Sequence, residues 1–202
     1  MTLPNTLTPR QIISIKFVLW SLCLIPLLRL LYLGLNDSLG ANPIEFITRS
    51  TGTWTLVGLL MTLAITPLRK LTGRTWLIRF RRLLGLFAFF YACLHFTTYI
   101  WLDQFFDPAS IIKDIYKRPF ITVGFTAFVL LIPLAYTSRQ SMMKKLGRGW
   151  QRLHRLVYLI ASLGVVHYWW LVKKDLTQPL IFACVLAILL AMRLPKFSNS
   201  RA

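Results

Sequence analysis

Six apolar segments of membrane-spanning length constrain the fold of this chain more than any other feature. A helix needs roughly 20 mostly apolar residues to cross the hydrocarbon core of a bilayer. The segments are residues 12–35, 53–68, 83–102, 119–137, 153–172 and 176–194 of 202. Hydrophobic residues make up 56% of the chain, more than a soluble domain of this size carries. The sequence therefore predicts an all-α membrane protein, a six-helix transmembrane bundle in the lipid bilayer.

The charged residues between the segments predict the orientation of this bundle. Most of the 24 lysines and arginines lie near the two termini and in the loops 69–82 and 139–155. All six acidic residues lie on the alternate side, namely Asp37, Glu45, Asp103, Asp107, Asp114 and Asp175. By the positive-inside rule both termini are cytoplasmic, and the first, third and fifth segments run outward. We therefore interpret the net charge of +18 as a topology signal and predict no nucleic-acid partner.

The rest of the chain predicts one domain over residues 1–202, since the loops are too short to hold another. Asn42, Pro43 and Glu45 suit the N-cap, first and third positions of a short interfacial helix. No internal repeat is evident. The chain has no Cys-x-x-Cys-His motif, so any haem would be a b-type haem without thioether bonds.

The three histidines, His95, His154 and His167, all fall inside or at the mouth of apolar segments. A neutral imidazole is a common iron ligand, and ionisable residues inside a membrane are functional candidates. His95 lies thirteen residues beyond Arg82, and His167 lies thirteen beyond His154, a rise of about 20 Å in each case. We therefore expect His95 and His167 to reach similar outer depth and to ligate one haem. The alternative is that the histidines only form hydrogen bonds within a helix bundle.

His154 is predicted near the inner end of the fifth segment, where it could anchor a second haem. On a straight helix His154 and His167 would point about 140° apart, so both could face one partner only after tilt, supercoiling or a distortion near Gly164. Arg29 interrupts the outer half of the first segment. It could pair with the propionates of an outer haem, or it could extend to the membrane interface.

Two other classes of function compete with haem binding. A proton-coupled transporter could use the intramembrane histidines as a relay, although every carboxylate lies outside the predicted spans. A purely structural assembly partner would bind no haem and would be colourless. An absorption spectrum separates both alternatives from a haem protein.

Several motifs resemble a known family, the MsrQ family, also known as YedZ. They cover residues 42–167 in pieces and keep their order: Asn-Pro-Ile-Glu at 42–45, Gly-Thr-Trp at 52–54, Thr-Pro-Leu-Arg at 66–69, Arg-Arg-Leu-Leu-Gly-Leu at 81–86, Ala-Phe-Phe-Tyr-Ala-Cys-Leu-His at 88–95, Arg-Pro-Phe-Ile-Thr at 118–122 and Trp-Gln-Arg-Leu-His-Arg-Leu-Val-Tyr at 150–158. The six-span layout also agrees.

The resemblance implies a function. The MsrQ family is similar to the transmembrane domain of ferric reductases and NADPH oxidases, whose b-type haems carry electrons across the membrane. It implies a multi-pass protein of the bacterial inner membrane with one or two haem b groups, and FMN for which no residue can be assigned. It implies a non-catalytic subunit that passes electrons to MsrP, a periplasmic molybdenum-containing methionine sulfoxide reductase. Since the chain has no nucleotide-binding domain, the donor would be the quinone pool or a cytosolic flavin reductase.

The sequence departs from the wider superfamily at one haem position. Where an oxidase has a histidine about fourteen residues before the one matched by His95, this chain has Arg81. The second ligand of an inner haem is therefore open, with Arg81, Arg82, Met192 or an empty position as candidates.

Overall fold

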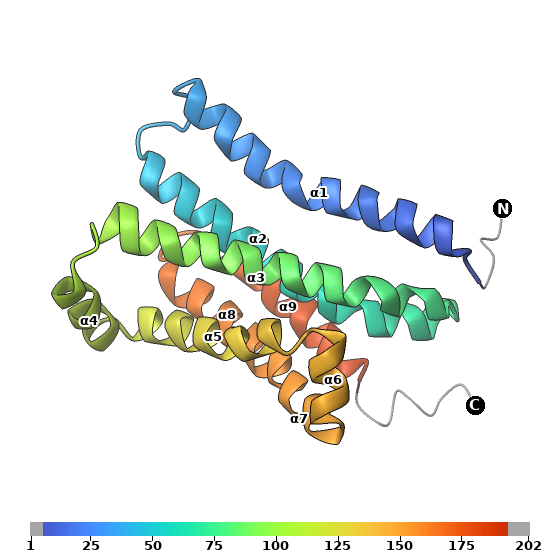
Figure 1. Ribbon diagram of the computed structural model, residues 1–202. Helices are drawn as coiled ribbons and strands as arrows, with labels where there is room; N and C mark the ends of the chain where they lie inside the picture. The colour runs from blue at the N-terminus through green and yellow to red at the C-terminus, as the bar shows by residue number, and fades with distance from the viewer. Residues whose placement is uncertain (1–5, 194–202) are drawn as a thin grey trace. The chain divides into compact units, whose positions relative to one another are not determined.

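The computed structural model describes residues 6–193, which form helices joined by short connections (Figure 1). Two compact units divide the chain, Met1–Phe105 and Phe106–Ala202. The first unit contains α1 (Pro9–Leu35), α2 (Pro43–Thr72), the 3₁₀ helix η1 (Thr75–Phe80), α3 (Arg81–Thr98) and the π-helical turn η2 (Tyr99–Asp103). The second contains α4 (Pro108–Lys117), α5 (Pro119–Tyr136), α6 (Gln140–Leu146), α7 (Arg148–His154), α8 (Leu156–Leu171) and α9 (Thr177–Ala191).

Four helical stretches of the described chain are long and apolar enough to cross a membrane. They are α1, α2, the continuous stretch Thr75–Asp103 and α5, while α9 is a shorter apolar helix. The all-helical fold is thus confirmed, with four candidate membrane spans among the described residues. The six crossings and the side of each terminus stay predictions, and the end of the sixth segment at Leu194 lies outside the described residues.

Close packing of α2 on α3 forms the core of the first unit. Gly58 of α2 lies against the backbone of Ala88, and a Cβ at residue 58 would approach the Ala88 Cα to 3.0 Å. Leu63 and Ala88 are fully buried. α2 ends at Gly73, whose φ of 70° is a left-handed conformation that glycine adopts without a steric cost.

The helix α1 makes fewer contacts and presents much of its apolar surface outward. It begins with a capping box, in which the Thr8 hydroxyl accepts a hydrogen bond from the Gln11 N–H. Phe17 and Tyr32 are among its exposed apolar side chains. The Tyr91 hydroxyl of α3 donates a 2.7 Å hydrogen bond to the Cys23 carbonyl, which ties α3 to α1. A helix with this much outward apolar surface suits contact with lipid.

The predicted interfacial helix at Asn42 is wrong as a separate element. Asn42 is indeed an N-cap, and its side chain accepts a hydrogen bond from the Glu45 N–H. The helix it begins runs on without a break for 30 residues as α2. Glu45 and Arg49, one helical turn apart, form an ion pair at 2.6 Å. This pair stabilises the polar first turns of α2, which the predicted span 53–68 does not include.

The second unit is built on α5 packed against α8, with α9 beside α8. The amphipathic helix α4, which the pattern of spanning segments does not include, is capped by Asp107 and joined to α5 by a hydrogen bond from the Thr122 hydroxyl to the Ile115 carbonyl. The predicted fifth span is divided at Arg155 into α7 and α8. There the Arg155 carbonyl accepts the N–H of Tyr158, three residues on. The helix distortion thus lies beside His154 and not near Gly164.

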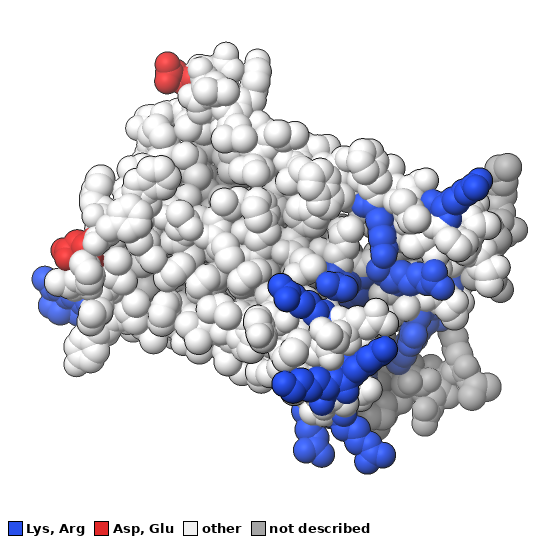
Figure 2. Space-filling model, in the orientation of Figure 1, with Lys and Arg blue, Asp and Glu red and all other residues white. Residues whose placement is uncertain are grey.

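Charged side chains are unevenly distributed over the visible face (Figure 2). The flanks of the long helices carry few of them, whereas lysines and arginines gather where helices end. Basic residues occupy the last turn of α2, namely Arg69 and Lys70, and the last turn of α6, namely Lys144 and Lys145. This distribution agrees with uncharged helix flanks in contact with hydrocarbon.

Candidate haem-ligating histidines

His95 lies on α3 and is held against α2. Its Nδ1 is 3.0 Å from the Thr48 carbonyl oxygen and 3.4 Å from the Thr51 hydroxyl. The Thr51 hydroxyl also lies 2.9 Å from the Ile47 carbonyl and 3.0 Å from that of Thr48, to which it can donate. The imidazole is half-buried.

His167 lies on α8 and is held against α5 in the same way. Its Nδ1 is 2.7 Å from the Phe120 carbonyl oxygen, in the first turn of α5. The Phe120 ring lies beside the imidazole, with the ring centres 6.4 Å apart.

The backbone carbonyls select the tautomer of both rings. A carbonyl oxygen only accepts hydrogen bonds, so Nδ1 of His95 and of His167 must carry the hydrogen. In a neutral imidazole the lone pair is then on Nε2, the nitrogen that can coordinate iron. A donor bond from the other ring nitrogen to a carbonyl is the usual way in which proteins orient a metal-binding histidine. The donor set therefore fits haem iron with imidazole axial ligands.

His154, at the end of α7, is held differently. Its Nε2 lies 3.1 Å from the hydroxyl of Thr137, and its ring stacks on Trp150 with the centres 4.0 Å apart. The Thr137 hydroxyl is 2.6 Å from the Pro133 carbonyl, to which it donates its single hydrogen. That hydroxyl must then accept from His154, so Nε2 carries the hydrogen and the lone pair is on Nδ1. The Trp150 N–H donates to the Thr137 carbonyl at 2.9 Å and completes the cluster.

The three candidate arginines lie in the first unit. Arg81 and Arg82 begin α3, where Arg81 is partly buried and Arg82 exposed. Arg29 of α1 is exposed, and its guanidinium lies 5.8 Å from the centre of the Phe46 ring of α2. Over residues 6–193, no three His, Cys, Asp or Glu side chains gather into a group that could hold a metal ion.

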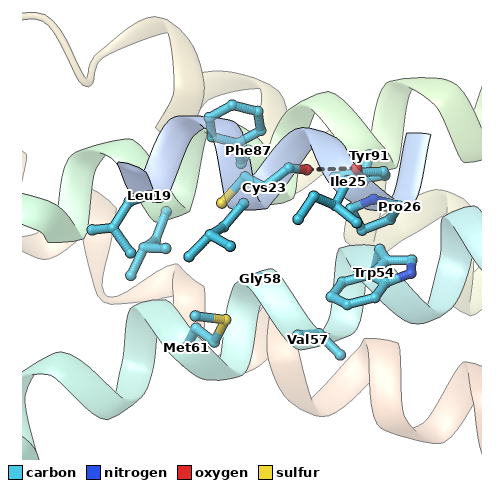
Figure 3. Close-up of a pocket in the computed structure, with 12 residues that line it drawn as sticks. Leu19, Cys23, Ile25, Pro26, Trp54, Val57, Gly58, Met61, Phe87 and Tyr91 are labelled. Atoms are coloured by element: carbon cyan, nitrogen blue, oxygen red, sulfur yellow. Dashed lines mark hydrogen bonds between the residues drawn. The ribbon is translucent and has the colours of Figure 1, made fainter. Parts of the chain in front are cut away.

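A separate apolar hollow of about 330 Å³ opens among α1, α2 and α3 (Figure 3). Pro26, Trp54, Met61 and Phe87 are among the side chains around it. No histidine lines the hollow. It therefore offers hydrocarbon contact but no imidazole for iron.

Sequence reasoning found the three histidines but missed the groups that hold them. The Thr48 and Phe120 carbonyls are backbone atoms, which leave no mark in the side-chain pattern. Thr137 and Trp150 are ordinary residues for a span end, and only the tertiary contacts join them to His154.

Residues 51–165, from α2 to α8, match the family model for the ferric reductase like transmembrane component. The match includes His95 and His154 and ends two residues before His167. The chain is thus a ferric reductase-like transmembrane protein.

Relatives of high sequence identity identify the family within this class. A protein from Herminiimonas arsenicoxydans is 61% identical over 189 residues, covering 92% of this chain and 87% of the relative. One from Bordetella pertussis is 56% identical over 197 residues, or 96% of each chain. Both carry the name protein-methionine-sulfoxide reductase heme-binding subunit MsrQ. This chain belongs to the MsrQ family. No solved structure matches it.

Proposed function

We propose that this chain is a haem b electron-transfer subunit of a methionine sulfoxide reductase system in the bacterial inner membrane. The observation that carries the proposal is the shared setting of His95 and His167, whose Nδ1 atoms donate to backbone carbonyls. This setting puts the lone pair of each ring on Nε2, the nitrogen that would coordinate iron. The heme-binding name of the relatives supports the same cofactor.

His95 and His167 would be the axial ligands of one outer haem. Their pairing rests on helix rise, since each lies about 20 Å beyond the basic start of its own span. When bound, haem supplies an iron that accepts and releases one electron. The protein's part is to hold both imidazoles neutral and correctly oriented, and to surround them with apolar helices that limit access of water.

His154 would anchor an inner haem. Ligation through Nε2 requires the hydrogen bond to Thr137 to be exchanged for iron, whereas ligation through Nδ1 would leave that bond in place. Arg81, Arg82, Met192 or no residue at all would complete the axial set. Arg152 and Arg155 flank His154 and could attract propionates or an anionic donor.

Arg29 would pair with a propionate of the outer haem. In the structure it stands over the Phe46 ring, which is consistent with a cation that is not committed to a carboxylate of the protein.

Electrons would enter on the cytoplasmic side from the quinone pool or a flavin reductase and leave to a periplasmic MsrP-like reductase. This direction follows from the predicted topology of six spans with both termini in the cytoplasm. The chain itself would catalyse no substrate reaction. FMN is a further expected cofactor, and its residues are not assigned.

The decisive experiment is an absorption spectrum of the detergent-purified chain, oxidised and then reduced with dithionite. We expect a b-type haem spectrum in the wild-type protein. His95→Ala and His167→Ala should each remove the same spectral component, because loss of either imidazole leaves the iron with an incomplete axial set. Full retention of bis-histidine haem in either variant would disprove the pairing. A colourless wild-type protein would instead favour the proton-coupled transporter or the structural partner.

A further inference from the structure

The two units hold their histidines with the same residue spacing. In the first unit the acceptor carbonyl is on Thr48 and the histidine is His95, 47 residues later. In the second unit the carbonyl is on Phe120 and the histidine is His167, again 47 residues later. Each carbonyl lies on the first helix of a packed pair, α2 or α5, and each histidine lies on the second, α3 or α8.

A glycine follows each acceptor carbonyl by one helical turn. Gly52 comes four residues after Thr48, and Gly124 comes four residues after Phe120. A Cβ at residue 52 would lie 3.0 Å from Cε1 and 3.2 Å from Nδ1 of His95. A Cβ at residue 124 would lie 2.7 Å from Nδ1 and 2.8 Å from Cε1 of His167. Both imidazoles thus occupy space that any other residue would fill.

The close approach is what allows the hydrogen bond to form. The Nδ1 atom that donates to the carbonyl is also an atom that a Cβ would displace. A ring pushed away from the glycine would rotate or retreat, so the distance from Nδ1 to the carbonyl oxygen would lengthen and the hydrogen bond would weaken. The glycine leaves space for the ring and the carbonyl accepts its hydrogen bond, so together they fix one orientation of the imidazole.

The inner histidine lacks this arrangement. Corresponding residues of the two units are 72 positions apart, as Gly52 and Gly124 are. The residue 72 positions before His154 is Arg82, so the first unit has no histidine that corresponds to His154. The hydrogen bond of His154 goes to a side-chain hydroxyl through Nε2. The repeated spacing is thus specific to the two predicted outer ligands.

We propose that Gly52 and Gly124 are positioning residues that seat the imidazoles of His95 and His167 against the Thr48 and Phe120 carbonyls for axial ligation of haem. The inference rests on the proposed function. A donor bond from Nδ1 makes the imidazole a stronger electron donor, which stabilises the ferric iron. Replacing either glycine should therefore weaken the bond and raise the midpoint potential of the outer haem.

The test compares four purified variants in their haem-loaded form. Gly52→Ala and Gly124→Ala place a methyl group against a histidine ring. Gly85→Ala is a tolerated control on α3, because its Cβ would meet only Thr62 at 3.7 Å. Gly58→Ala is a disruptive control on α2, because its Cβ would press on the Ala88 backbone at 3.0 Å without reaching a histidine. The measurements are haem content, the midpoint potential and the low-spin EPR signal, which reports axial ligand orientation.

We expect both test variants to raise the midpoint potential and to shift the EPR signal, with the larger change in Gly124→Ala because its approach is closer. Gly85→Ala and Gly58→Ala should keep the wild-type values in whatever haem they retain. If Gly124→Ala fails to accumulate, Gly52→Ala decides, since its clash is milder. If the haem-loaded test variants keep the wild-type midpoint potential and EPR signal, the inference is wrong while the proposed function stands. The inference is also wrong if Gly58→Ala shifts the potential and the EPR signal as much as the test variants do. Absence of haem from the wild-type protein would instead overturn the proposed function.

Discussion

Replacement of Thr137 by valine tests whether the hydrogen bond to His154 persists in the haem-loaded protein. Valine has nearly the shape of threonine, so the change removes the hydroxyl and leaves little cavity. Thr137 is buried, and its hydroxyl joins the Pro133 carbonyl to the His154 Nε2 atom. Both contacts end in the variant.

The expected loss follows from these two hydrogen bonds. The bond to Pro133 lies within one helix, where the same carbonyl also accepts the Thr137 N–H at 3.0 Å, so its loss costs little. The bond to His154 joins α5 to α7, and removal of one partner of a buried hydrogen bond costs about 1–3 kcal/mol. We therefore expect Thr137→Val to lower the free energy of unfolding by about 1–2 kcal/mol. Thr137→Ser keeps the hydroxyl and should lose less.

The assay is unfolding of the detergent-solubilised protein, followed by circular dichroism, for Thr137→Val, His154→Ala and the double variant. If the bond exists, the two changes are coupled, and the double variant loses less than the two single losses together. The hydrogen bond is refuted if Thr137→Val is as stable as the wild-type protein and the two changes affect the stability independently. That outcome is the one expected if iron holds Nε2 of His154, so the cycle also distinguishes the two ways in which His154 could bind an inner haem.

Three further predictions test other parts of the chain. Arg29→Gln should lower haem retention or shift the midpoint potential if Arg29 pairs with a propionate, and unchanged values in a redox titration would exclude that role and favour extension of the side chain to the membrane interface. Tyr91→Phe should reduce unfolding stability by about 0.5–1.5 kcal/mol, because the Cys23 carbonyl loses a donor from α3, and wild-type stability in the same unfolding assay would contradict this. Reporter fusions at either terminus should be active only as cytoplasmic reporters, and a periplasmic signal from one terminus would contradict the six-span topology.

The helical membrane class and the candidate ligands were predictable from sequence. Long apolar segments leave few alternatives to helices, because every backbone polar group in hydrocarbon needs a partner within the segment. Histidine is rare and costly in such a segment, so His95, His154 and His167 were visible as candidates without a structure. The family motifs around them pointed to the family that the comparisons then showed.

Helix boundaries were less predictable, because hydropathy reports burial and not backbone hydrogen bonding. The sequence predicts a separate helix at the polar start of α2, whereas the backbone continues unbroken from Pro43. The amphipathic α4 was missed because its composition is too polar for a span. The interruption at Arg155 is not marked by proline, which is absent from residues 148–171.

The sequence by itself determined that the three imidazoles lie within or at the mouth of apolar segments, because hydropathy can be read along the chain without knowledge of tertiary contacts. Only the tertiary structure decided which nitrogen of each ring carries the hydrogen, because that depends on groups about 17 to 47 residues away in the chain. Gly52 and Gly124 gave no sign of their role, since a glycine in a helix can serve many purposes. Their meaning comes from the close approach of a second helix, which brings an imidazole into the space that a side chain would need.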